Sequence, residues 1–203
     1  LTLLKTNVDI LEMEYGTNEW IDDMRTEMSN MTSLINNMVE LSKMSEMSDS
    51  SNKKRDVSME LSECLLDVVS EYEEAFDAKG FTLNKEITDG IVSKNDEANI
   101  RKLLTILFDN AVKYCDADGT ICVSLNAGKH IELAVTNSYQ AVDTVKFDKL
   151  FDRFYREDEA RTAGEGFGIG LAIAKNICEI ENAKIIAYKA ADAMIGFKVV
   201  IKK

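Results

Sequence analysis

The chain has 203 residues, enough for one or two domains with hydrophobic cores of their own. Its formal net charge is −12 and its only basic run is Lys53-Lys54-Arg55, which argues against nucleic acid as a main partner. No apolar run approaches the ~20 residues that span a bilayer, and no signal peptide is visible. The first residue, Leu1, is not an initiator Met, so we expect a fragment whose membrane or sensor portion would lie upstream.

Residues 1–48 are predicted to form a helical hairpin. Gly16-Thr17-Asn18 supplies the turn between its two helices. Two helices alone bury such apolar seams poorly, so a homodimeric four-helix bundle is expected. Packing of the hairpin on the rest of its own chain is the alternative. The apolar residues recur in steps of three and four, as in a heptad seam: Leu1, Leu4, Val8, Leu11 and Tyr15, then Ile21, Met24, Met28, Met31, Ile35 and Met38.

Residues 49–57 are polar and are predicted to be a linker. From Ser58 to the end at residue 203, helical and strand-like patterns alternate. The fold class predicted for the chain is α+β: the hairpin, then an α/β unit with helices layered on one face of a mixed sheet. Helices are expected at about 58–79, 96–114 and 168–182, and strands at 81–87, 120–126, 130–137, 184–190 and 196–202.

The four cysteines show no C-x-x-C spacing. Three of them lie within apolar patterns and Cys115 borders one, which favours buried free thiols over metal ligands or disulfides. Free thiols fit a reducing cytoplasm. The residues are Cys64, Cys115, Cys122 and Cys178.

The helix expected at 96–114 carries an apolar stripe with three polar residues beside it on one turn, namely Asn110, Lys113 and Tyr114. Each of them alone could belong to a solvated helix edge. Together they suit a nucleotide, with the Asn oxygen for Mg²⁺ and the Lys ammonium for phosphate oxygens. Mg²⁺ takes few ligands from protein and others from phosphate and water.

Residues 151–175 combine an aromatic-basic cluster with glycines just before a helix. Gly166, Gly168 and Gly170 alternate ahead of Leu171. Glycines let the backbone approach a ligand closely, and the N–H groups at a helix start suit phosphate. A plain loop explains the glycines alone about as well, but the upstream cluster favours nucleotide binding. It consists of Phe151, Arg153, Phe154, Tyr155 and Arg156.

These stretches resemble the sensor histidine kinases of two-component systems. FDNAVKY (108–114) resembles their N box, FDRFYR (151–156) their F box and GEGFGIGLAIAK (164–175) their G2 box. Residues 1–12 resemble the first dimerisation helix just after its phosphoacceptor motif, and residues 31–46 the end of the second. The resemblance covers nearly the whole chain in the family's order. It implies the ATP-binding α/β sandwich that these kinases share with Hsp90-type chaperones and gyrases.

The resemblance also implies roles for individual residues. Asn110 would ligate Mg²⁺, Lys113 and Tyr114 would contact phosphates, and Arg156 would approach the terminal phosphate. The glycines would hold the phosphate chain, and residues 152–165 would form a lid. With ATP and Mg²⁺ as cofactors, the expected ATP-binding set is Asn110, Lys113, Tyr114, Asn137, Phe154, Tyr155, Arg156, Gly166, Gly168, Ile169, Gly170 and Leu171.

Two binding positions depart from the family's pattern. Asn137 stands where these kinases carry an adenine-binding Asp, and Ser138 and Tyr139 follow it where a glycine is usual. An Asn oxygen can still accept from the adenine amino group, without charge; a strand-end turn residue is the other interpretation. Ile106 replaces a polar residue that helps to hold Mg²⁺, for which Asp109 is a possible substitute unless it is simply solvated.

The phosphoacceptor His is expected a few residues before Leu1, and the only histidine present, His130, reads as a strand-edge residue. The chain as given therefore cannot autophosphorylate by the family's route. The resemblance implies a kinase part that transfers the ATP γ-phosphate to a histidine elsewhere, for relay to an Asp of a response-regulator receiver domain. That regulator would dock on the hairpin, and the region would be the cytoplasmic domain of a protein anchored in the bacterial inner or plasma membrane.

Two other functions remain open on the sequence. A degenerate kinase would act as a dimerising scaffold that binds nucleotide weakly, as Ile106 and the lost glycine suggest. An ATPase of the chaperone-gyrase group is disfavoured, because those enzymes carry a Glu base at the position of Ile106.

Overall fold

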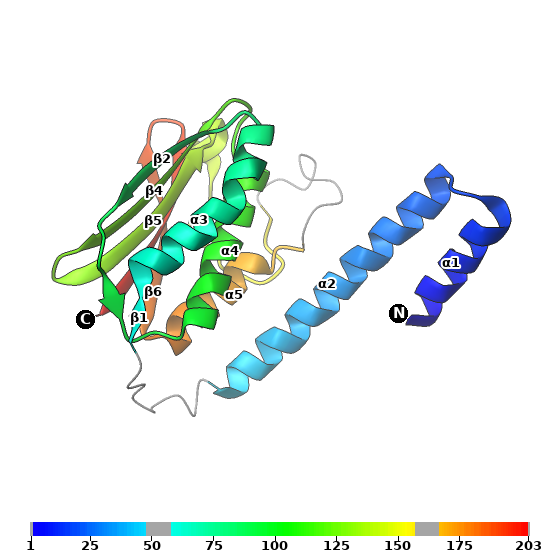
Figure 1. Cartoon of the computed structure of the whole chain (residues 1–203), viewed down its shortest axis with the longest axis horizontal. Coiled ribbons are helices and arrows are strands. Elements are labelled where there is room, and N and C mark those ends of the chain that lie inside the picture. Colours follow the sequence, from blue (N-terminus) through cyan, green and yellow to red (C-terminus); the bar gives the residue numbers. More distant parts are fainter. Residues whose placement is uncertain (1, 48–57, 157–166, 203) are drawn as a thin grey trace.

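The computed structural model describes residues 2–47, 58–156 and 167–202, so the predicted linker at 49–57 lies outside the described residues. Figure 1 shows a helical hairpin beside an α/β part in which three helices cover one face of a sheet. The elements are α1 (Thr2–Tyr15), α2 (Glu19–Met47), β1 (Met59–Glu60), α3 (Leu61–Ala78), β2 (Thr82–Ile87), β3 (Val92–Ser93), α4 (Glu97–Tyr114), β4 (Thr120–Ala127), β5 (His130–Ser138), η1 (Gln140–Thr144), α5 (Gly170–Ile180), β6 (Ala183–Ala191) and β7 (Met194–Lys202).

The main sheet has the strand order β2-β4-β5-β7-β6. Strand β2 runs parallel to β4, and the other neighbours are antiparallel, so the predicted mixed sheet is confirmed. Alternate residues of β4 are buried beneath the helices, as the period of two along a strand requires. The opposite face is polar in places: Lys198 Nζ on β7 pairs with Glu132 Oε2 on β5 at 3.2 Å.

The helices α3, α4 and α5 bury their apolar stripes against the inner face of the sheet. An aromatic group joins α3 to α4: the rings of Tyr72 and Phe76 each lie close to that of Phe108, with centroids 5.3 and 6.2 Å away. Each fully buried large apolar side chain contributes about 1.5–3 kcal/mol to folding. This core is why the α/β part can fold within one chain.

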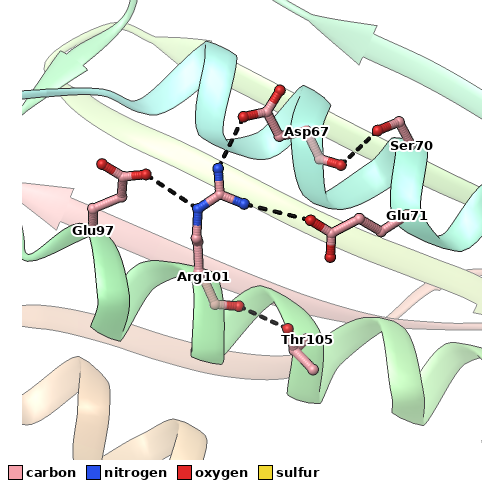
Figure 2. Close-up of polar contacts among 6 residues, drawn as sticks. All are labelled: Asp67, Ser70, Glu71, Glu97, Arg101 and Thr105. Carbon is pink, nitrogen blue, oxygen red and sulfur yellow. Dashed lines mark hydrogen bonds and ion pairs between the residues drawn. The ribbon is translucent and has the colours of Figure 1, made fainter.

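Helix α4 is also fixed to α3 by an ion-pair cluster around Arg101 (Figure 2). Its guanidinium lies 2.9 Å from Asp67 and 3.6 Å from Glu71, both on α3, and 3.1 Å from Glu97 on its own helix. Hydrogen bonds to Glu97 and Asp67 raise the pKa of Arg101 above its ordinary value. The Arg101 guanidinium therefore keeps its positive charge at any physiological pH.

A buried carboxylate fixes the start of α4 to the end of α5. Glu181 is only 7% exposed, and its oxygens accept hydrogen bonds from Asn95 Nδ2, the Asp96 backbone N–H and Asn99 Nδ2 at 3.2, 3.0 and 2.5 Å. Asp96 caps the same helix by accepting from the Asn99 backbone N–H. A carboxylate at a helix N-terminus is also favoured by the helix dipole. The two helices consequently run in opposite directions with a fixed register.

The hairpin is held together by a helix cap, a turn glycine and an ion-pair cluster. Asn18 caps α2 by accepting from the Ile21 backbone N–H at 3.1 Å, and Gly16 makes the turn with φ +76°, as glycine favours. Val8 on α1 and Ile21 on α2 are buried. Arg25 of α2 pairs with Asp9 and Glu12 of α1.

Helix α2 packs against α5 beside its predicted seam. Leu34 is partly buried against the core of the α/β part. The seam residues Met31, Ile35 and Met38 are exposed, by 49, 46 and 46%. Packing of the hairpin on its own chain, the alternative to the bundle, is thus observed at Leu34, while these three seam residues stay exposed.

Three short elements were not expected from the sequence. Strands β1 and β3 form a separate two-stranded sheet through the pairs Met59↔Ser93 and Glu60↔Val92. The 3₁₀ helix η1 follows β5 directly. The helices expected at 58–79 and 168–182 are shorter, at 61–78 and 170–180, because Glu60 pairs in β1 and Glu181 already serves as the cap of α5.

Candidate functional site

The polar residues predicted on α4 lie along its C-terminal half. Asn110, Lys113 and Tyr114 are half-buried, and Lys113 Nζ stands 5.2 Å from the centroid of the Tyr114 ring. Ile106, one turn before Asn110, faces the start of α5: a Cβ added to Gly170 would be 3.5 Å from Ile106 Cγ2. This face of α4 therefore borders the segment that carries the alternating glycines.

The aromatic-basic cluster and the glycines meet through their backbones. The Phe154 N–H donates to the Gly168 carbonyl at 2.9 Å. Gly168 has φ +66°, and a Cβ there would come within 2.5 Å of the Tyr155 carbonyl oxygen. The sequence pattern predicted that this glycine lets a ligand approach the backbone, whereas its close approach to residues 154–155 already requires glycine. Of the predicted set, Gly166 and most of the expected lid, 157–165, lie outside the described residues.

At the start of α5, backbone groups rather than side chains are available to bind a ligand. Ile169 is 2% exposed and belongs to the core, and Leu171 packs against that core. Only the backbone N–H groups near Gly170 can therefore serve a ligand here, which is the mode expected for phosphate at a helix start. Phe154, by contrast, is 54% exposed and has φ +66°.

Asn137 lies inside the sheet, not in a turn. It pairs in register with Ile121 of β4 and Ile195 of β7, and it is 1% exposed. Its Nδ2 donates to the Ser138 carbonyl at 3.1 Å. The interpretation of Asn137 as a strand-end turn residue is therefore wrong.

The residues after Asn137 explain how the chain manages without the usual glycine. Tyr139 has φ −156°, which is extended backbone that any residue adopts, and its side chain is buried. The Ser138 carbonyl accepts from the Asp116 N–H at 3.0 Å, and Asp116 Oδ2 accepts from the Gln140 N–H at 2.6 Å. These bonds tie the end of β5 to the C-terminal end of α4, close to Tyr114.

Asp109 does not share the face of Asn110. Its Oδ1 accepts a hydrogen bond of 2.6 Å from the Tyr72 hydroxyl on α3. Adjacent residues of a helix point about 100° apart, so a side chain directed at α3 cannot also ligate a metal beside Asn110. This contact disfavours Asp109 as a substitute metal helper, and nothing in the sequence signals it because the two residues are 37 positions apart.

Metal-binding clusters are absent from the part of the chain that the structure describes: no group of three or more His, Cys, Asp and Glu side chains could hold an ion. Asn110 can supply one amide oxygen, which fits Mg²⁺ only if phosphate and water complete its coordination. All four cysteines are free, with Cys64 and Cys178 buried and Cys115 and Cys122 half-buried. None of the described helices is both long and apolar enough to cross a membrane.

Residues 95–201 match the family described as histidine kinase-, DNA gyrase B- and HSP90-like ATPases. The chain belongs to this family. The match contains both α4 and α5, with the face of Asn110 and the glycines that border it.

Curated relatives are sensor proteins. The chain is 29% identical over 195 residues to the sensor protein DltS of Streptococcus agalactiae serotype V. The aligned region covers 96% of this chain and 49% of that protein. It is 31% identical over 174 residues to the signal transduction histidine-protein kinase BaeS of Escherichia coli, covering 84% of this chain and 36% of that protein. The chain thus spans about half the length, or less, of these relatives. The resemblance to sensor histidine kinases is confirmed.

Among solved structures, the histidine kinase ThkA in complex with the response regulator protein TrrA has a TM-score of 0.70 and 18% identity, covering 98% of this chain and 57% of that one. At this identity the likeness shows the shared fold. It extends over the hairpin as well as the α/β part.

Proposed function

We propose that this chain is the ATP-binding kinase part of a two-component sensor histidine kinase. The observation that carries the proposal is the meeting of three motifs distant in sequence: the Asn110 face of α4, the glycines that open α5, and Phe154, which is hydrogen-bonded to Gly168. Phosphoryl transfer needs in-line positioning and neutralised phosphate charge, and little covalent work from protein.

In this proposal each group has one task. Asn110 gives its amide oxygen to Mg²⁺, and the ammonium of Lys113 faces phosphate oxygens. The N–H groups near Gly170 bind the phosphate chain, with Tyr114, Phe154, Tyr155 and Arg156 as further contacts. Bound Mg²⁺ would draw charge from the β- and γ-phosphates.

Asn137 would accept from the adenine amino group. Its Nδ2 is engaged by the Ser138 carbonyl, which orients the amide so that the oxygen is the acceptor. An uncharged acceptor makes a weaker bond than a carboxylate. We therefore expect ATP affinity to lie toward the weak end for such sites.

The organisation around this site is part of the proposal. Residues 1–48 would form the homodimeric bundle, 49–57 the linker and 58–203 the ATP-binding domain. The phosphoryl group would pass to a histidine upstream of Leu1 and then to an Asp of a receiver domain docked on the hairpin. The complex of ThkA with a response regulator supports such a partner. The region would be cytoplasmic, in a protein anchored in the membrane through its upstream part.

The test compares Asn110→Asp with the original chain. The substitution places a negative charge beside the phosphates and should weaken Mg²⁺–ATP binding by at least about tenfold, or 1.4 kcal/mol. Asn84→Asp is the matched control, because Asn84 lies on the edge strand β2 with its Nδ2 near Cys122 Sγ. Equal affinity of Asn110→Asp and the original chain would contradict the assigned role.

Transfer itself is tested on the longer protein that contains the upstream histidine. Radiolabel from the γ-position of ATP should appear in an acid-labile, base-stable form, and Asn110→Asp should abolish it. Labelling that survives acid, or that persists in Asn110→Asp, would exclude histidine phosphorylation by this site.

A further inference from the structure

Tyr72 on α3 makes a specific contact with the turn that carries Asn110. Its hydroxyl donates to Asp109 Oδ1 at 2.6 Å and lies 3.3 Å from the Thr105 carbonyl oxygen, one turn earlier on α4. Its ring packs on Phe108, with centroids 5.3 Å apart. The Tyr72 ring therefore packs in the core, and its hydroxyl is hydrogen-bonded to the neighbouring helix.

The contact fixes how α4 is rotated at this turn. Asp109 directs its carboxylate at α3, while Ile106, which shares the face of Asn110, borders Gly170 on α5. Turning the helix about its axis would break the first contact and displace the second. The direction of Asn110 is thereby coupled to the Tyr72 hydroxyl.

The same bond keeps a negative charge away from the nucleotide side of the helix. Asp109 is exposed and precedes Asn110 directly. If its carboxylate were released, it could swing toward bound phosphates and repel them, since charges a few ångströms apart interact strongly near a protein surface.

We propose that Tyr72, which lies outside every nucleotide-binding motif of the chain, is a positioning residue for the Mg²⁺–nucleotide site. It acts through Asp109 by setting the orientation of Asn110. This inference rests on the proposed function, since it needs Asn110 to meet a nucleotide-bound metal.

Two further observations indicate that the proposal can be tested by the conservative substitution Tyr72→Phe. Burial and the hydrogen bond to Asp109 raise the pKa of Tyr72 above its ordinary value, so the hydroxyl remains a donor through the neutral and mildly alkaline range. Phenylalanine keeps the ring contact with Phe108, and the Arg101 cluster with α3 stays in place two turns earlier. Tyr72→Phe should therefore fold.

The experiment measures ATP affinity by calorimetry, with and without Mg²⁺, for Tyr72→Phe, Asp109→Ala, their double variant and Asp109→Asn. We expect Tyr72→Phe to weaken Mg²⁺–ATP binding about three- to tenfold, as for one lost hydrogen bond to a charged group. Asp109→Ala should weaken it less, because that variant also removes the charge that would repel the phosphates. The double variant should be no weaker than either single one. Asp109→Asn retains an acceptor and should stay within about twofold. Binding of ATP without Mg²⁺ should change less.

Tyr188→Phe is the matched control, because Tyr188 lies over Gly196 and Lys198 on the outer face of the sheet. No Mg²⁺–ATP binding by the original chain would defeat the proposed function itself. Binding by the original chain that Tyr72→Phe leaves unchanged would defeat only the positioning role. An equal loss in Tyr188→Phe, or a loss that only follows the fall in melting temperature, would also overturn it.

Discussion

The two parts of this molecule treat their apolar residues in opposite ways. In the α/β part, large side chains such as Leu104 and Phe108 are completely buried between helices and sheet. In the hairpin, Met31 and Ile35 are about half exposed although they lie on a regular seam. The α/β part therefore buries its apolar residues within one chain, whereas the hairpin needs a second surface to cover its seam.

The contact of Leu34 with the α/β part adds a second role for α2. Leu34 lies beside the seam, one turn from Met31 and from Met38, so α2 packs on α5 along one edge of the seam while Met31, Ile35 and Met38 stay exposed. A homodimer through the seam therefore remains compatible with the observed packing. Helix α2 would then contact both the partner hairpin and α5 of its own chain.

The largest expected effect is a loss of stability when a large buried side chain is removed from the core of the α/β part. Phe108→Ala removes a fully buried ring that packs on Tyr72 and Phe76, and it should cost about 3–5 kcal/mol in the free energy of unfolding of the α/β part. The matched change on the seam, Ile35→Ala, should cost that part less than about 0.5 kcal/mol. Urea denaturation followed by circular dichroism measures both. Equal costs would contradict the division between a closed and an open core.

The next effect concerns the seam itself. Met28→Glu together with Ile35→Glu places four like charges in the expected bundle and should weaken dimerisation by at least about 100-fold, or 2.7 kcal/mol. Sedimentation equilibrium should then find monomers, while the α/β part keeps its melting temperature. A dimer that persists in this variant would refute the bundle, and a simultaneous loss of the α/β fold would refute the independence of the two parts.

The smallest effect is a pH dependence confined to the α/β part, since all four cysteines lie there. Burial raises the pKa of Cys178 to about 12 and that of Cys64 to about 11, above the unfolded value near 9. Their stabilisation is therefore complete below pH 9 and is lost as the pH rises toward 11–12, because only the unfolded thiols ionise in that window. The loss is at most about 1.4 kcal/mol per pH unit for each thiol.

The check is chemical denaturation between pH 8 and 11 for the original chain and Cys178→Ala. The variant should show a shallower decline in unfolding free energy above pH 9, whatever its stability at pH 8. Identical slopes would mean that Cys178 does not contribute.

Sequence patterns were most informative where a regular apolar pattern extends over many residues. The helix expected at 96–114 forms at 97–114, and the strand expected at 120–126 forms at 120–127, because each buries a regular stripe of apolar residues. The two-residue strands β1 and β3 were missed because two residues are too few to show an alternating apolar pattern. They exist through the tertiary pairs Met59↔Ser93 and Glu60↔Val92.

The candidate site was predicted as a set of motifs, but not as a set of contacts. Asn110 and Gly168 were recognised by their local patterns. The hydrogen bond between Tyr72 and Asp109, and the capture of Asn99 by Glu181, join residues 37 and 82 positions apart, and no local pattern encodes them. The strand position of Asn137 likewise depends on its two neighbouring strands.

The proposed function requires that this chain bind ATP with Mg²⁺ despite Asn137 and Ile106. The most direct measurement is a calorimetric titration of ATP and of ADP into the chain, with and without Mg²⁺. We predict magnesium-dependent binding with a dissociation constant between about 1 µM and 1 mM, or roughly −8 to −4 kcal/mol. An absence of binding at millimolar nucleotide would contradict the account and would leave a dimerising scaffold as the function to pursue.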